Sequence, residues 1–125
     1  MTLTLLSVAL GGAIGATLRF LTNVAAMRLF GPNFPWGTVA VNVVGSVLMG
    51  ALVVLLAHKG GTRFAPFLMT GLLGGFTTFS AFSLDAVTLF QRGAVLQAGG
   101  YVFGTVLLGV LGLLAGMALV RGIWG

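Results

Sequence analysis

Apolar residues dominate four long stretches of the chain, and short polar or glycine- and proline-rich joints separate them. A transmembrane helix needs about 20 predominantly apolar residues to cross about 30 Å of hydrocarbon. Each stretch is long enough for one crossing. The pattern therefore predicts an all-α membrane protein in which residues 1–125 form a single four-span domain. The predicted spans are Leu3 to Ala26, Trp36 to Ala57, Phe64 to Leu89 and Leu96 to Val120.

The three joints predict that consecutive spans run antiparallel. The first joint, from Arg28 to Pro35, carries two prolines and a glycine, which suit a turn followed by a new helix. The second, from His58 to Arg63, and the third, from Gln91 to Gly93, are equally short. Joints of this length return the chain across the membrane beside the span that it has just left.

Composition agrees with the span pattern and excludes several classes of function. Hydrophobic residues make up 58% of the chain and charged residues 6%, whereas a soluble domain carries roughly 25% charged residues. The net charge is +5, but the basic residues are scattered singly, so nucleic-acid binding is not expected. The absence of cysteine excludes disulfides, thiolate metal sites and cysteine nucleophiles. Because neither a Ser/His/Asp spacing nor a His/Asp/Glu cluster occurs, an enzyme is not predicted.

The basic residues are nearly balanced between the two ends of the predicted bundle. Lys59, Arg63 and Arg121 fall at one end, and Arg28 and Arg92 fall at the other, with Arg19 towards the same side. Because the more basic side normally stays cytoplasmic, so small a bias allows insertion in both orientations. Opposed copies could then pair antiparallel. The alternative is that one orientation dominates for reasons that the charges do not reveal.

Glycine is frequent inside the spans, although it is a poor helix former. Small residues four apart allow two membrane helices to approach closely. Their number predicts a tightly packed bundle, and four thin helices alone leave little interior, so an oligomer is favoured. The spaced pairs are Gly11 and Gly15, Gly12 and Ala16, Ser46 and Gly50, Gly71 and Gly75, and Gly112 and Gly116.

Polar residues form a stripe on the second span. Thr38, Asn42 and Ser46 stand four residues apart and so share one helical face. One interpretation is a pore lining, since an amide near mid-membrane is costly without a use. The other is hydrogen bonding between helices that stabilises the bundle. In the fourth span Tyr101 and Thr105 repeat the spacing, but Gly109 ends that stripe.

The third span contains a segment that predicts a helix break. Gly74 and Gly75 are followed, after Phe76, by Thr77 and Thr78, which together make a poor continuous helix. Irregular backbone at this depth persists only where protein or a water cavity surrounds it, and its freed carbonyls suit a small hard cation. The alternative is an uninterrupted helix whose hydroxyls bond to the preceding turn.

Phe79 and Phe82 follow the predicted break and lie on nearly the same face. Such a pair commonly packs against lipid or protein, but the positive edges of the rings could also solvate an anion. The only carboxylate is Asp85, near the end of the span, and the only histidine is His58, in a joint. Without a mid-depth acid, passive conduction is favoured over proton-coupled transport, and an anion over a divalent cation.

Three segments together resemble the small bacterial fluoride channels of the Fluc or CrcB family. The match runs through nearly the whole chain, in order. The segments are Gly11 to Phe20, Gly37 to Gly45 and, most specific of the three, Gly74 to Ser83.

The resemblance implies a passive, fluoride-selective channel in the cell membrane that relieves fluoride toxicity as a dual-topology antiparallel homodimer. It implies a structural Na⁺ at the dimer interface, held by the carbonyls of Gly74 and Thr77. Arg19, Thr38 and Ser46 take structural or vestibule positions, Asp85 takes a peripheral one, and Gly109 departs from members that have a serine there. The fluoride path would use Asn42, Phe79, Phe82, Ser80, Tyr101 and Thr105.

Two other functions stay open at this point. A dual-topology small multidrug exporter would need a mid-span glutamate, which the chain lacks. A non-conducting membrane assembly protein would use the glycines for packing alone.

Overall fold

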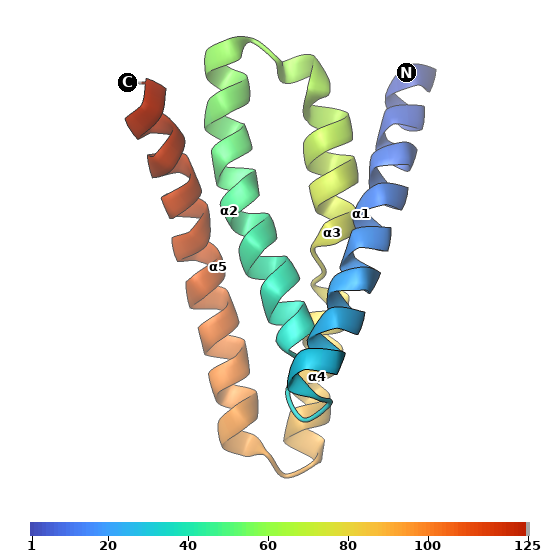
Figure 1. Ribbon diagram of the computed structural model, residues 1–125, viewed down its shortest axis with the longest axis vertical. Helices are drawn as coiled ribbons and strands as arrows, with labels where there is room; N and C mark the ends of the chain where they lie inside the picture. The colour runs from blue at the N-terminus through green and yellow to red at the C-terminus, as the bar shows by residue number, and fades with distance from the viewer. Residues whose placement is uncertain (125) are drawn as a thin grey trace.

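The computed structural model describes residues 1–124, which form long helices joined by short turns (Figure 1). Within them, four segments are long and apolar enough to cross a membrane, so the predicted four-span organisation is confirmed. The segments are Thr2–Phe30, Trp36–Lys59, Thr62–Gln91 and Val95–Ile123. The elements are α1 (Thr2–Phe30), α2 (Trp36–Lys59), the 3₁₀ turn η1 (Thr62–Phe64), the π-helical η2 (Pro66–Leu73), α3 (Gly74–Phe76), α4 (Ser80–Gln91) and α5 (Val95–Trp124).

Each helix runs a few residues past its apolar stretch and stops where the backbone chemistry changes. Helix α1 passes Ala26 and ends at Gly31, whose φ of 79° lies in the left-handed region and which precedes Pro32. Helix α2 ends at Gly60, with φ of 67° and its N–H on the Leu56 carbonyl. The polar last turns stay helical because the first breaker, rather than the loss of hydropathy, ends each helix.

The four spans pack in two pairs that are not consecutive in sequence. In Figure 1, α1 and the third span both start from the end that holds the chain termini, whereas α2 and α5 run the opposite way. The most extensive contacts join α2 to α5 and α1 to η2. Consecutive spans are antiparallel, as predicted. The closest packing, however, joins spans that run in the same direction.

Glycines lie where the helices of each pair approach most closely. A Cβ on Gly15 would collide with the Leu72 carbonyl oxygen, and one on Gly75 would lie 2.7 Å from the Gly12 carbonyl oxygen. Across the other pair, a Cβ on Gly116 would collide with the Val47 carbonyl oxygen. The spaced glycines therefore mark two backbone-to-backbone seams, one between α1 and the third span and the other between α2 and α5.

Most large apolar side chains face outward. Leu3, Phe20 and Phe103 expose 79%, 65% and 77% of their surface, in contrast to the interior of a soluble protein. A buried cluster of Phe82, Leu89, Ala98 and Tyr101 joins α4 to α5 near one end of the bundle. Lipid can cover the outward apolar surface, so the chain is a multi-pass membrane protein.

The third span is not one regular helix. It passes from the π-helical η2 into α3, which stops at Phe76, and α4 starts only at Ser80. Between them Thr77 is extended, with φ of −87° and ψ of 161°. Gly74 and Gly75 themselves are helical, so the departure from helix falls on the residues that follow the glycine pair.

The seam between α1 and the third span makes the first prediction. Gly15→Ala should lower the free energy of unfolding by about 1–3 kcal/mol, because the new methyl group meets a backbone carbonyl that cannot move aside. Gly104→Ala is the matched control, since no atom lies within 4 Å of its Cβ position. Unfolding of the purified protein in detergent measures both. Equal stability of the two variants would contradict the seam.

Candidate functional site

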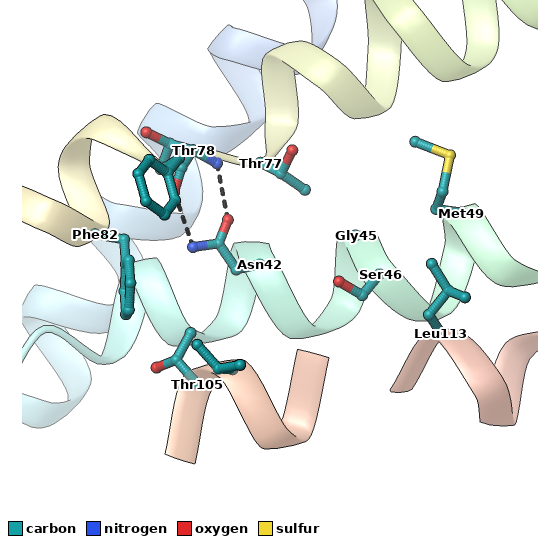
Figure 2. A pocket seen from close by; sticks show the side chains of 11 residues that line it. Asn42, Gly45, Ser46, Met49, Thr77, Thr78, Phe82, Thr105 and Leu113 are labelled. Carbon is teal, nitrogen blue, oxygen red and sulfur yellow. Dashed lines mark hydrogen bonds between the residues drawn. The ribbon is translucent and has the colours of Figure 1, made fainter. Parts of the chain in front are cut away.

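Asn42 of α2 pairs with the backbone of the interrupted segment in the third span. Its side-chain Nδ2 donates to the Thr78 carbonyl at 2.9 Å, and its Oδ1 accepts the Thr78 N–H at 2.8 Å. Figure 2 shows both bonds, with the amide of Asn42 turned from α2 towards Thr78. One side chain thus satisfies both backbone groups of Thr78, much as a neighbouring strand would.

Three further side chains meet backbone groups beside the interruption. Arg19 of α1 donates from Nε to the Gly75 carbonyl at 2.9 Å. The Thr78 hydroxyl accepts the N–H of Ala81, in the first turn of α4, at 3.1 Å. The hydroxyl of Thr77 donates back to the Leu73 carbonyl at 3.0 Å, one turn earlier. Polar side chains thus replace part of the helical hydrogen bonding that the third span loses here.

A cavity of about 300 Å³ opens between α2, the interrupted segment and α5. It brings together five of the predicted path or vestibule residues, Asn42, Ser46, Phe79, Phe82 and Thr105, from three different spans. Figure 2 shows Asn42 and Ser46 on one side of this space and Thr78 and Phe82 on another. Its other lining residues are Gly45, Met49, Thr77, Thr78, Val106 and Leu113.

The two predicted phenylalanines lie together but differ in exposure. Their ring centroids are 5.9 Å apart, with the ring planes tilted by 45°. Phe82 exposes 8% of its surface, whereas Phe79 exposes 78%. On its inner side the ring of Phe82 packs against the ring of Tyr101, with 5.1 Å between the two ring centroids. A row of three rings therefore runs from the outer surface of the chain into its core.

Thr105 is a buried hydroxyl without a partner. It is 8% exposed, and within residues 1–124 its Oγ1 is the buried side-chain polar atom that makes no hydrogen bond. A buried, unpaired hydroxyl costs about 1–3 kcal/mol, so its presence at the wall of a cavity indicates a use. One α-helical turn further along α5, a Cβ on Gly109 would lie 3.6 Å from the Ser46 hydroxyl. Ser46 therefore supplies a hydroxyl beside the position where Gly109 has none.

Asp85 occupies a more central position than the sequence suggested. Its Oδ2 accepts hydrogen bonds from the Thr38 hydroxyl at 2.8 Å and from the Tyr101 hydroxyl at 3.1 Å. Thr38 and Tyr101 are 6% and 1% exposed, so this network ties α2, α4 and α5 together within the fold. This link was not predicted from the sequence, although a lone carboxylate inside a span was the signal for it.

A second cavity of about 310 Å³ adjoins this network. It is lined by Thr38 and Asp85, by Asn23 of α1 and by the Phe34 to Gly37 turn at the start of α2. Tyr101 instead lines a smaller cavity with Thr105. The predicted path residues are thus spread over more than one cavity, and Thr105 lines both the main cavity and the one that Tyr101 lines.

The remaining predicted residues surround the interruption. Gly74 and Ser80 are exposed on the surface of this single chain, and Thr77 is half-buried. In residues 1–124, no group of three or more His, Cys, Asp or Glu side chains could hold a metal ion.

Comparison with known proteins gives this architecture a family. Residues 6–117 match the CrcB-like proteins, described as Camphor Resistance (CrcB). The chain belongs to the CrcB-like family. A protein of Cereibacter sphaeroides named fluoride-specific ion channel FluC is 70% identical over 118 residues, covering 94% of each chain. Proteins of the same name from Ruegeria sp. and Paracoccus denitrificans are 57% identical, covering 98% of each chain, and 53% identical, covering 97% of each chain.

The residues that match the family model include the candidate site. The matched residues include α2, the interruption in the third span and Thr105 of α5. The alignments cover 94% and 98% of the length of the relatives from Cereibacter sphaeroides and Ruegeria sp..

The hydrogen-bond network around Asp85 generates the second prediction. Tyr101→Phe should lower the free energy of unfolding by about 1.5–3 kcal/mol, because the carboxylate loses one of its two hydroxyl donors. Adding Thr38→Val, which removes the other donor, should lower it further. Thr22→Val is the matched control, since that hydroxyl bonds only to the Leu18 carbonyl of its own helix. Denaturant titration in detergent measures the free energy of unfolding of each variant. Values for Tyr101→Phe and for the double variant that equal that of the control would contradict the network.

Proposed function

We propose that this chain is a fluoride-selective channel that exports fluoride passively across the cell membrane, rather than an enzyme or a coupled transporter. The names of its relatives and its family membership support this function. The structural observation that carries it is the unpaired Thr105 hydroxyl, buried at the wall of a cavity beside two phenylalanine rings.

The lining of the main cavity suits a small anion. Fluoride is strongly hydrated, so a selective path must offer several hydrogen-bond donors and positive ring edges in succession. Thr105 and Ser46 offer hydroxyls, and Asn42 keeps one amide hydrogen beyond the bond to Thr78. No carboxylate lines this cavity. The nearby carboxylate of Asp85 is occupied on Oδ2 by the two hydroxyls, which spread its negative charge.

We propose that two copies complete the channel. Gly74, Phe79 and Ser80 are exposed on the single chain next to non-helical backbone. Lipid cannot satisfy such backbone, so protein must cover this surface. A second copy of the chain is the simplest cover. Because the basic residues are nearly balanced between the two ends, opposite insertion of the two copies is allowed, which supports an antiparallel homodimer.

The same covered surface suits a structural Na⁺. Gly74 and Thr77 would hold it through their carbonyls, and these neutral ligands match a monovalent cation better than a divalent one. Extended backbone at Thr77 and the diversion of the Thr78 N–H to Asn42 support free carbonyls at this point. The cation would link the interrupted segments of two copies and would raise the local potential for anions.

The third prediction tests the function directly. Liposomes that contain the purified protein should release internal fluoride, measured with a fluoride electrode, and should retain chloride under the same gradient. Phe82→Ile and Phe79→Ile should each slow fluoride efflux roughly fivefold, because each removes a polarised ring edge that contributes about 1 kcal/mol.

Phe103→Ile is the matched control, since that ring is 77% exposed on α5 and does not line the main cavity. Size-exclusion chromatography checks that every variant keeps the parent's assembly. Liposomes that retain fluoride would instead favour a non-conducting membrane assembly protein. Unchanged efflux in both variants would remove the aromatic pair from the path.

The fourth prediction separates conduction from folding at Thr105. Thr105→Val preserves the shape of the side chain and removes an unpaired buried hydroxyl, so stability should stay constant or rise. Fluoride efflux should nevertheless fall about tenfold or more, because a donor to the ion is lost. Thr105→Ser keeps the hydroxyl and should retain efflux. A valine variant with full efflux would show that the hydroxyl has no part in the path.

A further inference from the structure

The hydrogen bonds at the interruption divert two particular amide hydrogens from their helical acceptors. In a continuous α-helix the Thr78 N–H would bond to the Gly74 carbonyl, and the Ala81 N–H would bond to the Thr77 carbonyl. Here the first goes to Asn42 Oδ1 at 2.8 Å and the second to Thr78 Oγ1 at 3.1 Å. Each diversion deprives one carbonyl of its regular partner, and the two carbonyls are those of Gly74 and Thr77.

The carbonyl of the residue that follows each of these two accepts a hydrogen bond from a side chain. Arg19 Nε donates to the Gly75 carbonyl at 2.9 Å, and Asn42 Nδ2 donates to the Thr78 carbonyl at 2.9 Å. The side chains around the interruption therefore divide the backbone carbonyls into two groups. Gly75 and Thr78 are paired with protein donors, whereas Gly74 and Thr77 lose their helical donors.

We infer that Asn42 and Thr78 are positioning residues for a monovalent cation, because their side chains take up the two amide hydrogens that would otherwise pair with the Gly74 and Thr77 carbonyls. This inference rests on the proposed Na⁺ site and assigns a role to residues that do not themselves hold the ion. Asn42 acts from a different helix, α2, whereas Thr78 belongs to the interrupted segment itself.

The charges around the segment favour a monovalent ion. The chain's single carboxylate, Asp85, is engaged by Thr38 and Tyr101, and it lines the second cavity, not the main one. The nearest ionic group described at the interruption is the Arg19 guanidinium, which is positive. A divalent ion would find no negative ligand to offset its charge, whereas carbonyl oxygens suffice for Na⁺.

The positioning role of Asn42 and Thr78 can be tested without fluoride. Thermal unfolding of the purified protein is followed by tryptophan fluorescence while NaCl replaces choline chloride at constant ionic strength. The parent melting temperature should rise with Na⁺ and saturate. Thr78→Val should need roughly three- to tenfold more Na⁺ for half of that rise, because the Ala81 N–H regains the Thr77 carbonyl. Asn42→Ala should show a shift of similar size for the Gly74 carbonyl.

Thr78→Ser keeps the hydroxyl acceptor and should restore the parent response to Na⁺. Thr17→Val, whose hydroxyl bonds only to the Ala13 carbonyl of α1, controls for general destabilisation and should leave the Na⁺ midpoint unchanged. The comparison between valine and serine at position 78 decides the matter even if Asn42→Ala fails to fold.

The outcomes separate the inference from the proposal beneath it. A parent protein whose melting temperature ignores Na⁺ overturns the cation site and the positioning role together. A parent that responds to Na⁺, with an unchanged midpoint in Thr78→Val, overturns the positioning role alone. Neither result depends on whether the chain conducts fluoride, so a failure of the efflux test remains distinct.

Discussion

A bilayer offers no water to backbone N–H and C=O groups, so every interruption of a membrane helix must be met by protein. The third span stops being helical between Phe76 and Ser80, well inside the bundle. Asn42 and Arg19 supply partners from two other helices, and the Thr78 hydroxyl supplies one from within the segment. The positions of α1 and α2 follow from this requirement, because both must come within hydrogen-bonding distance of the same short segment.

The glycine seams make that approach possible. Helix α1 reaches the third span at Gly11 and Gly15, where side chains would meet backbone oxygens, and Arg19 lies one turn beyond Gly15. The seam between α2 and α5 similarly holds Thr105 opposite Asn42 and Ser46 across the main cavity. Close packing therefore does more than stabilise the bundle, since it sets the width of the space where the polar side chains meet.

Spacing along the chain predicted part of the lining of the main cavity. The four-residue repeat placed Asn42 and Ser46 on one face of α2, and both line the main cavity. Spacing did not predict that Asn42 would also bond to the Thr78 backbone, nor that Asp85 would accept two hydroxyls. A helical repeat defines which residues share a face, whereas hydrogen-bond partners depend on which helix packs against that face.

The sequence alone determined the class of protein and the number and approximate extent of the spans. Those properties depend on local hydropathy, on backbone propensity and on glycine and proline, which short stretches of chain already contain. Only the tertiary structure decided that α1 pairs with the third span and α2 with α5, and that Thr105 is left without a partner. Such pairings bring together residues far apart in the chain, and their energies come from contacts that no single segment possesses.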